Sequence, residues 1–236
     1  MLDAQLAAGL REVTLWALPV LFAIPLHEAA HGLAAWRLGD DTAYRLGRVT
    51  LNPLRHIDPF GTVILPALLL MAHSPFLFGY AKPVPVAFNR LRNPRRDTIL
   101  VAAAGPAMNI ILAFVSGLLI HIGVRLPFAA ADWAVQTLDR SILLNLILAL
   151  FNMIPLPPLD GGRVAVGLLP KPIGLRLAKI ERHGILILLV LLVALPLLGQ
   201  TIGYDLNLLP RLLFPALEYL YNTIVSITGI GGIVAP

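Results

Sequence analysis

Long apolar runs, separated by short segments rich in arginine and lysine, dominate the hydrophobic pattern of this chain. A run of about 20 apolar residues can cross the hydrocarbon core of a bilayer as a helix. A weaker run at 60–80 is interrupted by prolines at positions 66 and 75. We therefore expect an all-α polytopic membrane protein with about five to six transmembrane helices. The five stronger runs cover residues 12–37, 98–124, 141–169, 184–203 and 208–227.

The composition supports this class of protein. Hydrophobic residues make up 58% of the 236 positions and charged residues only 13%, whereas soluble domains are about a quarter charged. The formal net charge of +5 would suit nucleic-acid binding, but the basic residues lie in the short connections where the positive-inside rule places them. We therefore predict a multi-pass protein of a prokaryotic inner membrane that contacts the lipid bilayer and binds no nucleic acid. The pattern does not predict an oligomeric state.

The basic clusters also predict a topology. One cluster precedes the 60–80 run and another follows it, and both are typical of cytoplasmic connections. A full crossing at 60–80 would place one cluster outside, so we favour a re-entrant or tilted hairpin there. The helices at 12–37 and 141–169 then both run from outside to inside. The two clusters are Arg37, Arg45, Arg48 and Arg55, and then Lys82, Arg90, Arg92, Arg95 and Arg96.

The first apolar run contains the stretch His27-Glu28-Ala29-Ala30-His31. Residues four apart on a helix lie one turn apart on the same face, so His27 and His31 can present imidazole nitrogens to one metal ion, with Glu28 beside them. Ionisable groups in a membrane span are costly and are usually retained for function. The run also has the apolar character of a signal peptide, but it lacks a small-residue cleavage pattern, and cleavage would destroy the motif.

A catalytic zinc site normally has three protein ligands and one open position. The chain has no cysteine, so the third ligand is expected to be another His, Asp or Glu. Asp160 is the best candidate, because prolines end the helix before it and the predicted topology places it at a depth comparable with His27. The alternative is an aspartate that caps a helix-breaking loop.

Three motifs, taken together and in order, make the sequence resemble the site-2 protease family of intramembrane zinc metalloproteases. The resemblance implies that His27, His31 and Asp160 bind one zinc ion per chain and that Glu28 is the catalytic acid and base. It also implies that Asn109 lies near the site, where it would hold substrate backbone or the developing oxyanion. The motifs are His27-Glu28-Ala29-Ala30-His31, Gly105-Pro106-Ala107-Met108-Asn109, and N-x-x-P-x-P-x-x-D-G at 152–161.

The motifs divide the chain into a predicted catalytic core at 1–170 and C-terminal helices at 171–236 with a possible gating role. No regulatory PDZ or CBS module is recognised, so the chain looks like a minimal form. The valines and prolines that alternate at 78–86 suit an edge strand, which can pair with an unwound substrate, and resemble the family's membrane-associated β-loop. An ordinary proline-rich loop is the alternative.

Two further ionisable residues are weaker candidates. His56 would either approach the site or orient the turn that follows it, and we favour the second interpretation. Glu218 would either gate access between helices, or lie at an interfacial helix end or pair with a nearby arginine, and again we favour the second interpretation.

These features predict an intramembrane zinc metalloendopeptidase that hydrolyses peptide bonds within or near transmembrane segments of single-span membrane proteins, with its active site toward the cytoplasm. A non-proteolytic metal-binding protein or transporter would use the same ligands, but it gives no reason for Glu28. A non-haem Fe(II) oxygenase also uses two histidines and a carboxylate, but nothing in the sequence indicates a cosubstrate pocket. The pattern does not predict the natural substrate.

Overall fold

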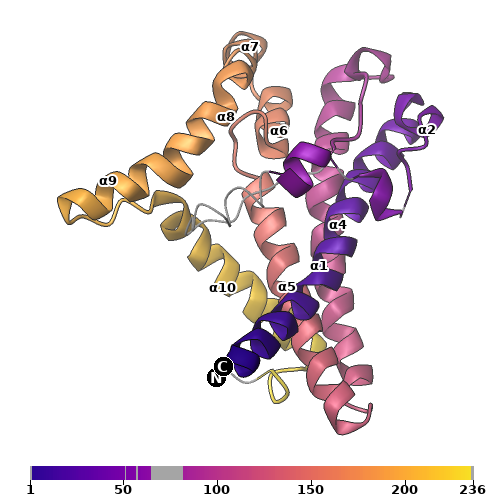
Figure 1. Ribbon diagram of the computed structural model, residues 1–236. Helices are drawn as coiled ribbons and strands as arrows, with labels where there is room; N and C mark the ends of the chain where they lie inside the picture. The colour runs from indigo at the N-terminus through magenta and orange to yellow at the C-terminus, as the bar shows by residue number, and fades with distance from the viewer. Residues whose placement is uncertain (1, 51, 57, 65–81, 235–236) are drawn as a thin grey trace.

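The computed structural model describes residues 2–50, 52–56, 58–64 and 82–234, and these form helices joined by loops, with no strand among them (Figure 1). This confirms the predicted all-α class. The α-helices are α1 (Leu2–Arg37), α2 (Thr42–Arg45), α4 (Pro94–Gly123), α5 (Phe128–Asn152), α6 (Asp160–Leu168), α7 (Lys171–Ala178), α8 (Glu181–Leu189), α9 (Leu195–Ile202) and α10 (Leu208–Thr228). The short helices are η1 (Pro53–Arg55), η2 (Pro59–Ile64), η3 (Phe88–Arg90) and η4 (Val190–Ala194).

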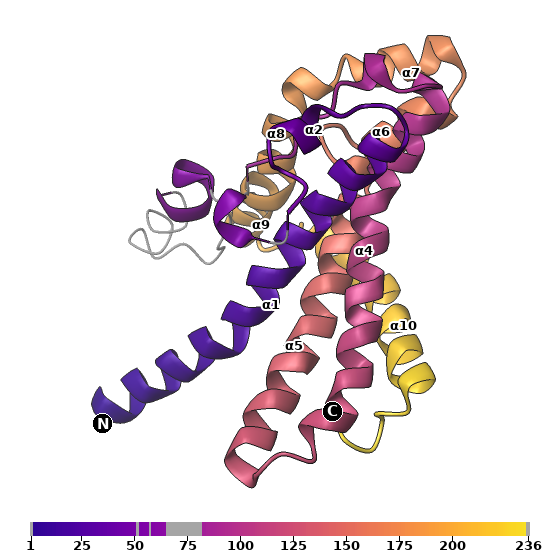
Figure 2. The same ribbon diagram turned by 90° about the vertical axis from the view of Figure 1, so that its right-hand side faces the viewer.

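The three long helices α1, α4 and α5 pack together as the centre of the molecule (Figure 2). The first helix leads up to α2, α4 returns, and α5 follows α4 after a short turn, so α1 and α5 run in the same direction. This is the relative direction that the basic clusters predicted. Buried side chains of α4, α5 and α10 form the main apolar core, which contains Ala113, Ile120, Ile142, Leu146, Leu217 and Ile224.

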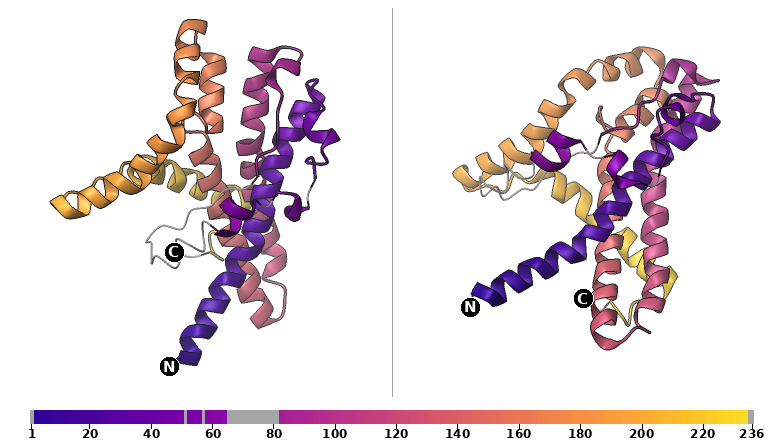
Figure 3. Two further views of the ribbon diagram at one scale, coloured as in Figure 1. Left: turned by 45° about the horizontal axis from the view of Figure 1, so that its top comes forward. Right: turned by 45° about the vertical axis from the view of Figure 1, so that its right-hand side comes forward.

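Among the residues that the structure describes, four helical segments are long and apolar enough to cross a membrane, which supports a polytopic protein. They are Gly9–Arg37, Pro94–Gly123, Phe128–Asn152 and Glu181–Ile202. The last of these joins α8, η4 and α9, and Figures 1 and 3 show it extending away from the bundle before α10 returns to it. The expected fifth run forms α10, which carries Arg211 and Glu218 and is not among the four.

The weaker run at 60–80 is only partly described. A π-helical turn, η2, covers its first residues, and the remainder of the predicted re-entrant hairpin lies outside the described residues. The same holds for 78–81 at the start of the predicted edge strand. Residues 82–87 are described and adopt no regular secondary structure.

The predicted third apolar run breaks where its prolines stand. Helix α5 ends at Asn152 and α6 begins at Asp160, because the closely spaced Pro155, Pro157 and Pro158 each lack a helical N–H donor and clash with the preceding turn. The intervening loop folds back onto α6, so that a β-carbon at Gly161 would lie 2.6 Å from the carbonyl oxygen of Ile154. A β-carbon at Gly184 of α8 would contact the carbonyl oxygen of Pro157. The loop before Asp160 is therefore held between α6 and α8.

One end of the bundle gathers the basic segments. Here α2, the beginning of α4, α6 and α7 lie together (Figure 1). The backbone N–H of Arg92 donates to the carbonyl oxygen of Leu38 over 3.0 Å. The fully buried carboxylate of Asp40 accepts hydrogen bonds from the N–H of Thr42 at 3.1 Å and of Ala87 at 2.6 Å. These bonds join the end of α1 to the segment that leads into α4.

Candidate metal centre

Three possible metal-ligand atoms converge where α1 meets α6. The Nε2 atoms of His27 and His31 lie 3.1 Å apart, and each lies 3.2 Å from Oδ2 of Asp160. A tetrahedral zinc ion with donors at 2.0–2.1 Å separates them by about 3.3 Å. The three atoms therefore fit three corners of one coordination tetrahedron. All three residues are buried, so the set is shielded from bulk solvent.

Local and long-range structure contribute differently to this arrangement. The helical spacing of α1 places His27 and His31 on one face, as the sequence predicted. Asp160 reaches them because α5 runs parallel to α1 and ends at its prolines, so that α6 begins at the level of the histidines. The sequence predicted that Asp160 and His27 lie at comparable depth, and the structure places their donor atoms 3.2 Å apart.

The other ring nitrogens face acceptors on α4. Nδ1 of His31 lies 2.7 Å from the carbonyl oxygen of Val101, and Nδ1 of His27 lies 2.5 Å from Oδ1 of Asn109. Both acceptors favour a proton on Nδ1, which leaves the Nε2 lone pair available for a metal. This is the outer hydrogen bonding that histidine ligands normally have, and it supports a metal site.

Gly105 forms the wall of the site on the α4 side. A β-carbon there would lie 2.6 Å from Nε2 of His27 and would contact Nε2 of His31. The space that three donors and a metal require is therefore kept open by the absence of a side chain. Sequence reasoning noted this glycine only as part of a motif, and a glycine within an otherwise apolar helix was the available signal.

Asn109 lies near the site, where the sequence predicted it. Its side chain is completely buried, and both of its polar atoms have protein partners. Oδ1 faces His27, and Nδ2 donates to Oδ1 of Asn145 on α5 over 2.8 Å. Asn109 thus connects α1 to α5 through α4.

Glu28 lies on α1 beside the metal-facing histidines and is partly exposed. Its Oε2 accepts a hydrogen bond of 2.7 Å from the backbone N–H of Val84. The segment at 82–87 therefore contacts α1 through this carboxylate. Pro83 and Pro85 on either side of Val84 have no N–H to donate.

The two weaker candidates lie outside this donor set. His56 is buried, its Nε2 bonds to the carbonyl oxygen of Thr50 at 3.1 Å, and its own carbonyl accepts from the N–H of Lys82 at 2.8 Å. These contacts agree with a role in orienting the turn. Glu218 is exposed on α10.

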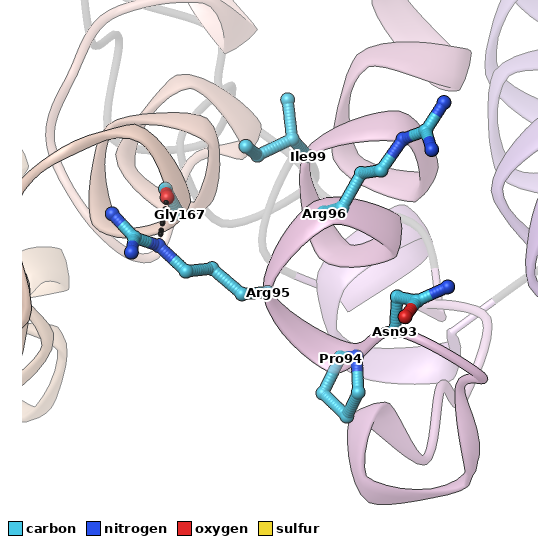
Figure 4. A pocket seen from close by; sticks show the side chains of 6 residues that line it. All are labelled: Asn93, Pro94, Arg95, Arg96, Ile99 and Gly167. Atoms are coloured by element: carbon cyan, nitrogen blue, oxygen red, sulfur yellow. Dashed lines mark hydrogen bonds between the residues drawn. The ribbon is translucent and has the colours of Figure 1, made fainter.

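Within the described part of the chain, we consider two cavities beside the central helices. The larger, about 480 Å³, lies between the beginning of α4 and α6 (Figure 4). Arg95 lines it and donates from Nε to the carbonyl oxygen of Gly167 over 2.8 Å. No metal-donor residue lines this cavity, so we separate it from the metal centre. The smaller, about 160 Å³, lies beside α1 and is lined by Leu26, Ala29, Ala30, Leu33, Val49, Thr50 and Met108.

The geometry describes an all-helical protein with apolar spanning segments and a buried cluster of two histidines and an aspartate. Comparison with known proteins gives the family: the model of Peptidase family M50 matches residues 120–195. This match includes Asp160 but not the histidines of α1. No solved structure matches the chain.

Relatives matched over most of the chain extend this result. The chain is 40% identical over 178 residues to "Putative zinc metalloprotease YwhC" of Bacillus subtilis (strain 168), covering 74% of this chain and 78% of that protein. It is 32% identical over 186 residues to "Putative zinc metalloprotease Rip2" of Mycobacterium tuberculosis (strain ATCC 25618 / H37Rv), covering 78% and 68%. For Rip2 of Mycolicibacterium smegmatis (strain ATCC 700084 / mc(2)155) the identity is 31% over 177 residues, covering 73% and 64%. The chain belongs to Peptidase family M50, which is the site-2 protease family. The resemblance to that family in the sequence is therefore confirmed.

Proposed function

We propose that this chain is an intramembrane zinc metalloendopeptidase that hydrolyses peptide bonds within or near transmembrane segments of single-span membrane proteins. The convergence of His27, His31 and Asp160, with their donor atoms 3.1–3.2 Å apart, is the observation that carries this proposal. Membership of a peptidase family and the names of the relatives support zinc and proteolysis. The apolar helices support a membrane location.

In this proposal His27, His31 and Asp160 hold one zinc ion. When bound, zinc polarises the scissile carbonyl and makes a water molecule a better nucleophile near neutral pH. Glu28 takes a proton from that water at its carboxylate and passes it to the leaving amine. Because the N–H of Val84 engages Oε2, we assign the proton transfer to Oε1.

Substrate backbone must be extended for hydrolysis, so a transmembrane substrate has to unwind locally. The segment at 82–87 forms neither helix nor strand, and the N–H of its Val84 contacts Glu28. We propose that unwound substrate lies along this segment, in the manner of an added strand. Residues that weaken helices would then favour cleavage when they occur near the cut.

We assign the metal centre to the cytoplasmic side of a prokaryotic inner membrane, because it lies toward the end of the bundle that gathers the basic segments. Cleavage there would release a cytoplasmic fragment, as in regulated intramembrane proteolysis. Residues 1–170 would form the catalytic core, while the helices at 171–236 support it. The close approach of Gly184 of α8 to Pro157, in the loop before Asp160, supports the role assigned to these helices.

The test pairs zinc stoichiometry with cleavage of a panel of single-span substrates in liposomes, for the parent chain and Glu28→Gln. Glutamine keeps an oxygen for the N–H of Val84 but cannot act as a base at neutral pH. We expect about one zinc per chain in both proteins and cleavage only by the parent. Asp160→Ala should lose zinc as well as cleavage. Cleavage by Glu28→Gln, or zinc bound equally well by Asp160→Ala, would contradict the proposal.

A further inference from the structure

A row of hydrogen-bonded polar side chains runs from the metal centre on α1 across α4 to α5. It begins at His27 on α1, continues through Asn109 on α4, and reaches Asn145 and Ser141 on α5. Asn109 and Asn145 are 0% and 1% exposed, so water does not compete for these hydrogen bonds. Among apolar helices such a row is costly unless each member has a partner.

The direction of donation along the row is set at its far end. Nδ2 of Asn145 lies 2.8 Å from the backbone carbonyl oxygen of Ser141, and a carbonyl can only accept. The amide nitrogen of Asn145 must therefore face Ser141, which turns its oxygen toward Asn109. Nδ2 of Asn109 donates to that oxygen over 2.8 Å.

The same constraint then reaches the histidine. Because the nitrogen of Asn109 is used on Asn145, its oxygen faces Nδ1 of His27 at 2.5 Å. An oxygen acceptor at this position requires the proton to be on Nδ1. The neutral ring then carries its lone pair on Nε2, the atom that points at His31 and Asp160.

His31 reaches the same state by a shorter route. Its Nδ1 lies 2.7 Å from the carbonyl oxygen of Val101 on α4, so a backbone acceptor holds its proton directly. In both histidines a backbone carbonyl thus determines which ring nitrogen carries the proton. For His31 this carbonyl accepts directly from the ring, and for His27 it acts through the side-chain amides of Asn109 and Asn145. Ser116 adds a further bond at the far end, with its Oγ 2.8 Å from Oγ of Ser141.

We infer that Asn145 is a positioning residue that, through Asn109, selects the Nδ1-protonated form of His27 and so presents Nε2 to the metal. This inference rests on the proposed metal site but adds a residue that touches neither metal nor substrate. It also assigns Asn109 to holding His27. Both polar ends of the Asn109 side chain are used in this role.

The experiment compares the parent chain with Asn145→Leu, which keeps the side-chain bulk and removes the acceptor for Asn109. Thr137→Val is the matched control, because Thr137 lies on α5 eight residues before Asn145, is buried, and has no hydrogen-bond partner for its hydroxyl in the described part of the chain. Zinc affinity is measured by competition with a chelator. Nitrogen NMR of 15N-histidine-labelled protein reports which ring nitrogen of each histidine carries the proton, with and without zinc.

We expect Asn145→Leu to weaken zinc binding by about 10- to 100-fold, the range typical for lost outer-shell partners. In the zinc-free variant His27 should become a mixture of the two neutral forms. His31 should keep its proton on Nδ1, since Val101 holds it directly. Asn145→Ser, whose hydroxyl can accept from Asn109 and donate to Ser141, should restore part of the affinity, and Thr137→Val should match the parent.

Unchanged zinc affinity and an unchanged His27 signal in Asn145→Leu would overturn the inference. An equal disturbance of His27 and His31 would also overturn it, because that result indicates general loss of packing. Failure of the proposed metal site would look different: in the parent itself, zinc would leave the signals of His27 and His31 unmoved.

Discussion

At Gly105 the candidate metal centre has no room for a side chain. A β-carbon there would lie 2.6 Å from Nε2 of His27, closer than nonbonded atoms approach. Asn109, one turn further along α4, bonds the opposite side of the same ring. Two residues of one motif thus act on the same ligand, one by leaving space and one by holding its orientation.

Gly105→Ala is expected to weaken zinc binding by about 5- to 150-fold, which corresponds to the ~1–3 kcal/mol cost of overpacking a close contact. Chelator competition measures this. Gly117→Ala on the same helix is the control, because its β-carbon would meet Thr228 of α10, 2.9 Å away. That variant should lose thermal stability and keep its zinc affinity. Parental affinity in Gly105→Ala would show that the ligands can move aside.

Val84→Pro removes the backbone N–H that reaches Oε2 of Glu28. Residue 84 already precedes a proline, which favours the extended backbone that proline also accepts. A hydrogen bond to a charged group contributes about 1.5–3 kcal/mol, so we expect cleavage to slow by about 10- to 100-fold with unchanged zinc affinity. Val84→Ala keeps the N–H and should cut at nearly the parental rate. Equal activity in Val84→Pro and Val84→Ala would show that the N–H of Val84 has no role in cleavage.

Between elements, the connection from α1 to α4 depends on Asp40, which lies outside the spanning segments. Burial opposes ionisation of this carboxyl, but hydrogen bonds from the hydroxyl of Thr42 and from the N–H groups of Ala87 and Thr42 outweigh it. The pKa of Asp40 is therefore held below its usual value. Its charged form holds the end of α1 against the segment that carries Val84.

The lowered pKa of Asp40 stabilises the fold at pH values above about 3.9, the pKa of an aspartate in the unfolded chain. This contribution is lost as the pH falls through the pKa that Asp40 has in the folded protein. We therefore expect a loss of thermal stability below about pH 4 that Asp40→Asn does not share, since an amide at this position carries no charge at any pH. Thermal unfolding in detergent between about pH 3 and 7 measures this loss. Asp41→Asn is the control, because its ion pair with Arg45 is near the surface and such pairs contribute little. Identical pH profiles for parent and Asp40→Asn would contradict the assignment.

For the whole molecule, the arrangement of helices determines how the protein sits in a membrane. The segments with most of the basic residues lie at the end occupied by α2, α6 and α7, while the turn between α4 and α5 lies at the opposite end (Figure 2). Beyond the contact of Gly184 with the loop before Asp160, the α8–α9 segment extends away from the bundle, and only 11% of its most apolar stretch is buried within the protein. Lipid is therefore its expected environment.

Because the chain has no cysteine, single introduced thiols can report this orientation. Tyr44→Cys lies at the basic end and Phe128→Cys at the other, and both native side chains are exposed. We expect a membrane-impermeant thiol reagent to label Phe128→Cys in intact cells and Tyr44→Cys only after permeabilisation. The reverse pattern would place the metal centre on the outer side.

What the sequence determined by itself was mostly local. Apolar runs predicted the long helices because about 20 apolar residues suffice to span a bilayer, and the i, i+4 spacing of His27 and His31 placed them on one face. Proline placement predicted the break before Asp160. These features depend on the chain within one or two turns, so they can be read without a partner helix.

Only the tertiary structure decided which groups meet across helices. The contacts of Asn109 with His27 and of Val84 with Glu28 join residues 82 and 56 positions apart, and they depend on helix rotation and depth, which local periodicity does not specify. The same is true of Asn145, whose role follows from the direction of hydrogen bonds that end at a backbone carbonyl. The motifs identified the candidate site residues, and the packing of α1, α4, α5 and α6 determined how each is held.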